Sequence, residues 1–270
     1  MIALEERVRS PVAEGMFYPE YRAETLAYMR AFGLERGKGG SARVIIAPHG
    51  AWELSGAMAG AAFAAAGGRN GKKNPSRIVI LGPVHDRREE GLFLTNSHFF
   101  QTPLGNIPVD QEAIAKFVAS SPLFEINDIP HLQEHSIEVL LPFVKYYFPR
   151  ASIVPILMGQ PQEPLIDALA CALRTICGPT MDNTLLVISC NLAVHSSADT
   201  AFFMAEECVR LFSEQKNAEL SVALLDGRLI SCGGGLIASL LQSGLVDSMH
   251  PNCVSHSLLS VQSEEHNTVC

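Results

Sequence analysis

Hydrophobic residues along this chain gather in short, nearly uninterrupted runs that are rich in β-branched side chains. The four clearest runs read RVIIAP, RIVILGP, SIVPILM and TLLVISC, and they predict strands at 43–48, 77–82, 152–158 and 184–190. Their apolar character is continuous rather than alternating. Strands of this kind are covered on both faces, as in a parallel or mixed sheet flanked by helices.

Helical periodicity occupies the stretches between these runs. Helices are predicted at 55–66, 110–121, 134–148, 162–176 and 198–212. Asp110 is placed to cap the second of them. Alternating strands and helices predict an α/β protein with a central, mostly parallel or mixed sheet flanked by helices. With no internal repeat, we expect one domain over 1–261 and a polar, disordered tail over 262–270.

Composition and charge narrow the functional classes. Of the 270 residues, 47% are hydrophobic and 18% are charged, which suits one large core. The formal net charge of −8, with no basic cluster, argues against nucleic acid or an anionic membrane as a partner. The sequence shows no apolar segment long enough to span a bilayer and no signal peptide. Seven scattered cysteines without a CxxC pair fit reduced thiols, so we expect a cytoplasmic protein.

Two histidines stand in matching positions after predicted strands. His49 follows RVIIAP directly, and His85 comes two residues after the Gly-Pro that ends RIVILGP. One strand–helix–strand crossover separates them, so we expect them on neighbouring strands. Ligands bind at the carboxyl edge of open α/β sheets, and imidazole nitrogen is a common metal ligand. Either histidine alone reads equally as a loop residue without a special role.

Cys232 lies in the segment LISCGGGLIASLL, between an apolar run and a predicted helix. A thiolate at a helix N-terminus is stabilised by free backbone N–H groups and is a ligand for zinc, iron or copper. A buried structural cysteine beside a Gly-rich turn is the alternative. The glycines lack both the GxGxxG spacing and the Walker lysine, so they give only weak support to a phosphate or nucleotide site.

Two further polar segments could contribute chemistry. HLQEHSIE places His131 and His135 one helical turn apart, but its order is not the HExxH of zinc proteases. Its carboxylates, Glu134 and Glu138, are predicted in the first turn of a helix, where capping and catalysis are both open roles. SCNLAVH follows the fourth strand and carries Asn191 and His195, and the sequence offers His135, Asn191 and His195 as candidate catalytic residues.

In their order along the chain, eight segments resemble the Memo family, also known as AmmeMemoRadiSam system protein B. The resemblance runs from about Arg9 to about Leu259. The segments are PVAEGMFYP, RVIIAPHGAWELSG, RIVILGPVH, FFQTPLGNIPVD, EHSIEVLLPF, IVPILMG, LVISCNLAVH and ISCGGGLIASLL.

The resemblance implies a fold like that of class III extradiol dioxygenases, which bind non-haem iron with two histidines and a carboxylate. In the Memo family a cysteine takes the carboxylate position, so the implied ligands are His49, His85 and Cys232. The implied metal is iron or copper, with zinc as an alternative. The resemblance also implies redox chemistry on an unknown small molecule or protein, and an association with radical-SAM and AMMECR-type proteins.

The sequence departs from the family pattern around this implied site. The family aspartate and histidine of SSDxxH are replaced by Asn191 and Val194, with His195 one residue late, and Asp86 stands where a second histidine is usual. Two functions therefore compete, and whether the chain is an enzyme stays open. Retention of all three implied ligands favours a metal-dependent oxidoreductase. Loss of the neighbouring acid and base favours a non-catalytic module that binds metal, peptide or metabolite.

These departures generate a prediction about catalysis. We expect little or no ring cleavage of simple catechols, even with Fe(II) supplied, because a cysteine replaces the carboxylate and Asn191 and Val194 replace the proton-transfer residues. Absorbance of the ring-opened product measures the activity. The double variant Asn191→Asp, Val194→His should raise any activity present. Robust cleavage by the unaltered chain would contradict the prediction.

Overall fold

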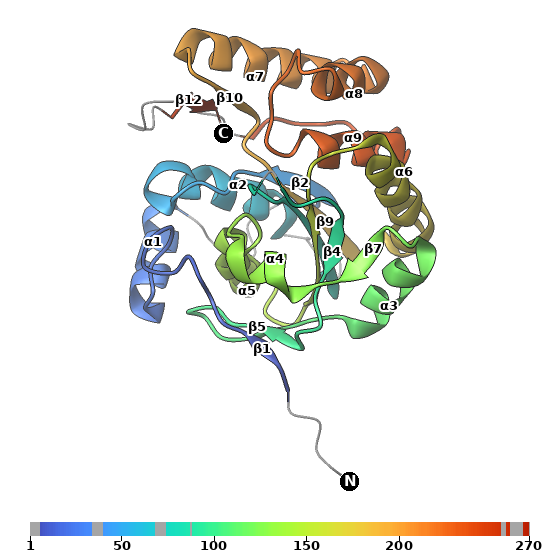
Figure 1. The fold of residues 1–270 in the computed structure, drawn as a ribbon. Helices are drawn as coiled ribbons and strands as arrows, with labels where there is room; N and C mark the ends of the chain where they lie inside the picture. Colours follow the sequence, from blue (N-terminus) through green and yellow to red (C-terminus); the bar gives the residue numbers. More distant parts are fainter. Residues whose placement is uncertain are drawn as a thin grey trace.

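In the computed structural model, a single mixed α/β domain is built around a six-stranded sheet (Figure 1). The structure describes residues 6–33, 40–67, 74–86, 88–254, 258–259 and 267–269. The strand order is β2-β9-β3-β8-β4-β7. Their bounds are β2 Val44–Ala47, β9 Thr184–Ser189, β3 Arg77–Pro83, β8 Ser152–Met158, β4 Leu92–Leu94 and β7 Phe124–Ile126.

The four strands predicted from hydrophobic runs are confirmed, and all four are parallel. Ile80 of β3 pairs with Val187 of β9 on one side and Pro155 of β8 on the other. Their carboxyl ends therefore share one edge of the sheet. The expectation that His49 and His85 follow neighbouring strands is wrong, because β9 lies between β2 and β3. Since β9 comes much later in the sequence, local spacing carried no sign of this insertion.

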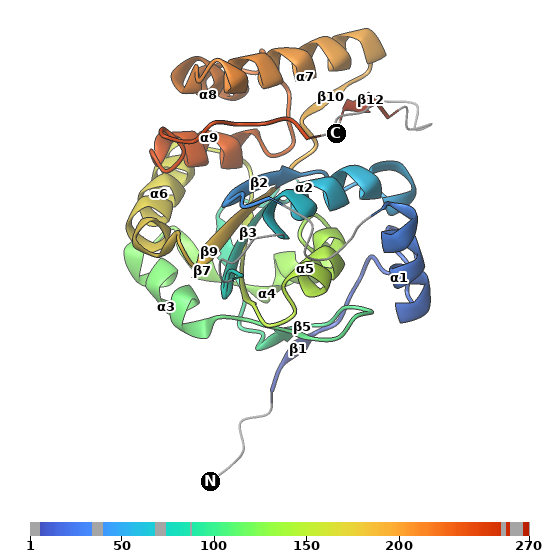
Figure 2. The same cartoon turned by 180° about the vertical axis from the view of Figure 1, so that it is seen from behind.

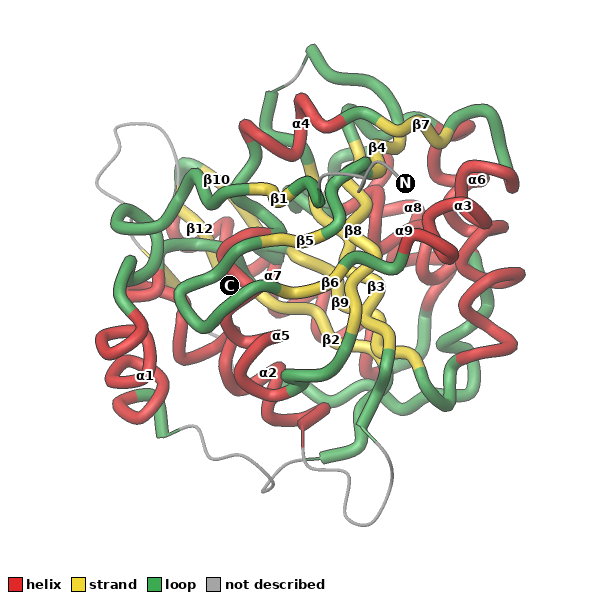
Figure 3. The backbone as a smooth tube through the Cα atoms, turned by 90° about the horizontal axis from the view of Figure 1, so that it is seen from below, coloured by secondary structure: helices red, strands yellow, loops and turns green. Residues whose placement is uncertain are grey.

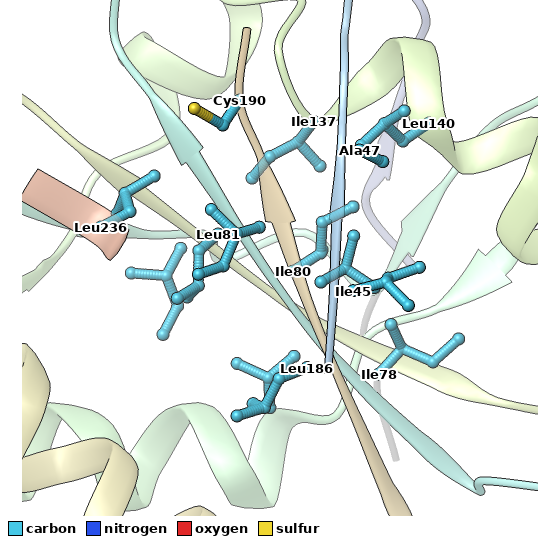
Figure 4. Close-up of a cluster of buried hydrophobic side chains, with 14 of the residues drawn as sticks. Ile45, Ala47, Ile78, Ile80, Leu81, Ile137, Leu140, Leu186, Cys190 and Leu236 are labelled. Atoms are coloured by element: carbon cyan, nitrogen blue, oxygen red, sulfur yellow. The ribbon is translucent and has the colours of Figure 1, made fainter. Parts of the chain in front are cut away.

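Helices cover both faces of the sheet (Figures 1 and 2). On one side are α2 (Ala57–Gly67) and α5 (Leu141–Tyr147), and on the other are α6 (Glu163–Ala172) and α9 (Gly234–Gln242). Figure 4 shows the consequence for β3: Ile78 and Ile80 lie on one face, while Leu81 lies on the other with Leu236 of α9. Both faces are buried, so each such side chain contributes roughly 1.5–3 kcal/mol of apolar burial. The remaining helices are α1 (Arg22–Ala31), α3 (Gln111–Ser120), α7 (Ala198–Ser213) and α8 (Asn217–Leu225).

Asp110 caps α3 as predicted, because its carboxylate accepts a hydrogen bond of 2.9 Å from the Ala113 backbone N–H. The predicted helix at 134–148 is wrong in its first half. Helix α4 (Asp128–Gln133) ends before Glu134, and regular helix resumes only with a 3-10 turn at Glu138–Leu140 and then α5. The Glu134 carboxylate binds the backbone N–H groups of His135 and Ser136 instead of letting them join a helix.

A buried ion pair ties the N-terminal segment to this irregular region. Arg9 and Glu138 are 3% and 1% exposed and are hydrogen-bonded to each other. The Glu138 carboxylate also accepts from the Ala13 backbone N–H and from the Tyr18 hydroxyl, each at 2.8 Å. Burial, followed by the charge of Glu138, raises the pKa of Tyr18 far above its ordinary value. The network holds the segment between Arg9 and Tyr18 against the carboxyl edge of the main sheet.

Two small sheets lie beside the main one (Figure 3). One contains β1 (Val8–Arg9), β5 (Phe99–Phe100) and β6 (Ile107–Pro108), and the other contains β10 (Ala193–His195), β12 (Asn267–Val269) and β11 (Leu258–Leu259). Most of the predicted tail, 262–270, lies outside the described residues. Of the helices that the structure describes, none has both the length and the apolar character needed to cross a membrane.

His131 gives the fold a pH dependence that can be measured. It is 2% exposed, and its Nε2 donates to the Phe93 carbonyl oxygen at 3.1 Å. Burial lowers its pKa to about 4. Between about pH 6.5 and pH 4 the unfolded chain therefore binds a proton that the folded chain does not. Stability should fall as the pH drops through this window, by roughly 3 kcal/mol in all.

Urea unfolding at several pH values between 4 and 7.5 tests this expectation. His131→Gln keeps a donor for Phe93 but cannot be protonated, so its unfolding free energy should depend less steeply on pH than that of the wild type. His250→Gln, at an exposed position, should leave the dependence unchanged. Parallel pH profiles for wild type and His131→Gln would contradict the assignment.

Candidate metal centre

Three histidines converge at the carboxyl edge of the sheet. His49 follows β2, His85 follows β3, and His135 lies in the irregular segment after α4. One ring nitrogen from each lies within 4.8 Å of the other two, a spacing that could hold a metal ion. His49 is 1% exposed, whereas the His85 side chain is 42% exposed. The cluster is therefore closed on the His49 side and open to solvent at His85.

Glu134 fixes the orientation of two of these rings. Its Oε1 lies 3.0 Å from His85 Nδ1 and 3.1 Å from His135 Nδ1. The two rings stack at an angle of 14°, with 4.9 Å between their centroids. Burial opposes ionisation of Glu134, but the hydrogen bonds with His135 and His85 outweigh it and hold the pKa of this carboxyl far below its ordinary value. A carboxylate only accepts hydrogen bonds, so both Nδ1 atoms carry protons, and in the neutral form of each ring the lone pair lies on Nε2.

The Ser189 hydroxyl fixes the orientation of the third ring, that of His49. Ser189 Oγ donates to the Ser136 carbonyl oxygen at 2.6 Å and lies 2.6 Å from His49 Nδ1. Because its single proton goes to Ser136, the hydroxyl must accept the Nδ1 proton of His49, which leaves Nε2 as a lone pair. Burial, then the neighbouring His85 and His135, lower the pKa of His49 well below its ordinary value. His49 is therefore a neutral imidazole with its free nitrogen turned inward.

Cys232 adds a sulfur atom beside this nitrogen. Cys232 Sγ lies 3.6 Å from His49 Nε2 and accepts a hydrogen bond of 3.0 Å from the Asn191 backbone N–H. The sequence places Cys232 just before α9, which begins at Gly234. A Cβ on the intervening Gly233 would lie 2.7 Å from Cys190 Cβ, so only glycine permits this close approach.

Asn191 joins the histidine and cysteine sides of the site. Its Oδ1 accepts from the His49 backbone N–H at 3.3 Å, and its carbonyl oxygen accepts from Ser231 Oγ at 3.1 Å. An amide does not transfer protons at neutral pH, so the contacts recorded for Asn191 position its neighbours. His195, the third candidate catalytic residue, lies in β10, where its Nδ1 accepts from the Ser197 backbone N–H at 3.0 Å. The structure does not include it in the histidine cluster.

A second cysteine lies next to the first. Cys190 follows β9 directly, one residue after Ser189. Cys190 Sγ lies 2.9 Å from Ser231 Oγ. The neighbouring Cys232 thiol lowers the pKa of Cys190, although burial raises it.

Phe17 is an aromatic neighbour of the histidine cluster that the sequence alone did not identify. The Phe17 ring packs on the His135 ring, with 4.3 Å between centroids. In the sequence, Phe17 appears only as part of the motif PVAEGMFYP. The buried pair of Arg9 and Glu138 holds this motif in place. Glu134 was noted as a capping or catalytic candidate, but its contact with two histidines could be found only once His85 was known to lie beside it.

The donor set fits a metal ion. Metal-binding histidines characteristically direct the second ring nitrogen to a carboxylate, carbonyl or hydroxyl, which fixes the tautomer and raises the basicity of the free nitrogen. All three histidines here have such a partner, and a cysteine sulfur lies beside one of them. The residues of the site therefore could hold a metal ion.

Because Glu134 contacts both His85 and His135, we expect a substitution of this carboxylate to weaken metal binding. Glu134→Gln puts an NH₂ group either at the oxygen that serves both rings or at the oxygen that accepts from the His85 backbone N–H, so two donors face each other in either orientation. Zinc affinity, measured by competition with a fluorescent chelator, should fall roughly 10–100-fold. Glu163→Gln, at the exposed start of α6, is the matched control. Wild-type affinity in Glu134→Gln would show that this carboxylate does not organise the centre.

Comparison with known proteins identifies the family of the chain. The sequence model of a family described as Memo-like protein matches residues 9–269. A MEMO1 family protein of Thermotoga neapolitana is 30% identical over 249 residues, covering 88% of each chain. One from Methanobrevibacter smithii is 29% identical over 74% of this chain and 71% of its own, and one from Pyrococcus abyssi is 35% identical over 60% and 57%. These matches show that the chain belongs to the Memo family.

Proposed function

We propose that this protein binds one transition-metal ion through His49 Nε2, His85 Nε2 and Cys232 Sγ. The observation that carries the proposal is the convergence of imidazoles whose Nδ1 atoms are already engaged by Ser189 and Glu134, with a sulfur 3.6 Å from His49 Nε2. Two neutral imidazoles and a thiolate carry one negative charge. This set suits iron, copper or zinc better than magnesium or calcium, which prefer oxygen ligands.

His135 is proposed as the residue that meets the substrate. Its ring packs on Phe17 and stacks on His85, and Glu134 accepts its Nδ1 proton. The free Nε2 can then accept a hydrogen bond or a proton from a bound molecule. Its nitrogen is also close enough to serve as a ligand in place of Cys232. Comparison of variants at the two positions separates these roles.

We further propose a metal-dependent oxidoreductase that acts on a small molecule or a protein. The bound metal would supply electron transfer and polarisation of a coordinated group. The protein's own residues would hold the neutral imidazoles, exclude water on the buried His49 side and leave an approach on the exposed His85 side. A non-catalytic binding module is the alternative. The specific observation that favours it is Asn191, whose side-chain amide accepts from the His49 backbone N–H and cannot transfer a proton, while its backbone N–H donates to Cys232 Sγ.

Metal content of protein purified without added metal tests the ligand set. We expect about one equivalent of a transition metal in the wild type. Zinc affinity of His49→Ala, His85→Ala and Cys232→Ser should each fall about 100-fold or more, since each removes one of three donors. His135→Ala should change zinc affinity by less than about tenfold, and His195→Ala should bind as the wild type does.

The pattern of losses decides between the assignments. A large loss in His135→Ala with a small loss in Cys232→Ser would replace the cysteine by a third histidine as ligand. Absence of metal from the wild type, together with no measurable zinc binding, would contradict the metal site altogether. Circular dichroism of each variant shows whether a loss reflects the site or the fold.

A further inference from the structure

The thiols of Cys190 and Cys232 lie side by side beneath the proposed metal centre. Both sulfurs approach the same backbone atom, the Asn191 carbonyl oxygen, which is 3.3 Å from Cys190 Sγ and 3.5 Å from Cys232 Sγ. Both segments also meet at Ser231, whose Oγ lies 2.9 Å from Cys190 Sγ. The metal site as proposed uses only Cys232. Cys190 is left as a second, unassigned sulfur in contact with a ligand.

A cross-link between the two cysteines requires their backbones to be close. A disulfide needs Cα atoms roughly 4.4–6.8 Å apart and Cβ atoms about 3.8 Å apart. Gly233 follows Cys232 directly, and a Cβ built on it would lie 2.7 Å from Cys190 Cβ and 2.8 Å from Cys190 Sγ. The segment that carries Cys232 is therefore packed against Cys190 itself. Figure 4 shows the Cys190 sulfur pointing from the end of β9 toward the side on which Leu236 of α9 lies.

The two sulfurs differ in how easily a reagent can reach them. Cys232 is partly exposed, whereas Cys190 is 2% exposed. An oxidant in solution therefore meets Cys232 first. Cys190, held beside it by Ser231 and Asn191, is placed to react with the product. Such an arrangement, an accessible thiol with a resolving thiol beside it, is typical of reversible cysteine oxidation.

We propose that Cys190 and Cys232 form a reversible disulfide that withdraws the Cys232 sulfur from the metal centre. The release of the metal rests on the proposed function, whereas the disulfide itself does not. The co-reactant is a hydroperoxide, with hydrogen peroxide as the simplest member. A low-molecular-weight thiol reverses the reaction.

The chemistry balances in two steps. The Cys232 sulfur attacks one peroxide oxygen, the O–O bond breaks, and the products are a sulfenic acid and one water molecule. The Cys190 sulfur then attacks the Cys232 sulfur. The S–S bond forms, the S–O bond breaks, and the departing hydroxide takes the remaining thiol proton to leave as a second water. Two thiols lose two electrons and two protons, and one peroxide accepts them.

The disulfide between Cys190 and Cys232 is tested on the metal-free protein. We treat it with stoichiometric hydrogen peroxide, block the remaining thiols, and map peptides by mass spectrometry without reduction. The expected result is a cross-linked pair of peptides containing Cys190 and Cys232, which disappears on addition of dithiothreitol. Cys171→Ser removes an exposed thiol and should give the same cross-link. Persistence of both free thiols in the wild type, or pairing of Cys232 with another cysteine, would overturn the proposal.

Cys190→Ser provides the matched variant, because a hydroxyl can keep the hydrogen bond to Ser231. Without a resolving thiol, peroxide should convert its Cys232 to sulfenic and sulfinic acids, seen as mass gains of one and two oxygen atoms. Unmodified Cys232 in this variant would show that Cys232 is not the first sulfur oxidised, contrary to the proposal.

The consequence for the metal is tested separately on zinc-loaded protein, because zinc is redox-inert and does not decompose peroxide. Peroxide should weaken zinc binding by the wild type about 100-fold, with release in proportion to the disulfide formed and recovery after reduction. A disulfide without zinc release would overturn the link to the metal. Wild-type protein that binds no zinc contradicts the proposed function instead, and the metal-free experiment then decides the disulfide alone.

Discussion

The arrangement of the candidate site depends on one buried, ionised carboxylate. Glu134 sits where α4 ends, and it accepts hydrogen bonds from the backbone N–H of His85, His135 and Ser136 and from the Nδ1 atoms of His85 and His135. Burying a charge costs free energy unless it is fully hydrogen-bonded. Here the same bonds that satisfy the carboxylate fix two rings in one tautomer and interrupt the helix. The local fold and the chemistry of the site therefore follow from one interaction.

The parallel sheet supplies the rest of the geometry. The strands β2, β9 and β3 end at one edge, and β9, between the other two, brings Ser189 to the His49 ring. The next residue, Cys190, follows the strand and meets the segment before α9. Two consecutive residues at the end of β9 thus contact the His49 ring and the segment that carries Cys232.

Membership of the Memo family and the departures from its pattern are compatible with this arrangement. The positions that hold imidazole and thiolate are kept, whereas Asn191 stands where the family pattern has an acid. Asn191 keeps a positioning role, since it holds the His49 backbone and the Cys232 sulfur. Cys190 follows Ser189 where the family pattern SSDxxH has a second serine, so the motif here carries a sulfur beside the segment of Cys232.

The sequence by itself determined the four parallel core strands, the Asp110 cap and the location of His49, His85 and Cys232 at element ends. These features are local, because hydrophobic runs and capping residues act over a few neighbouring positions. Only the tertiary structure decided that β9 separates β2 from β3, that Glu134 serves two histidines rather than a helix, and that Cys190 meets Cys232. Each of these depends on contacts between residues far apart in the sequence, such as Cys190 and Ser231, whose positions differ by 41. Such contacts are set by how strands order in the sheet, which local patterns do not encode.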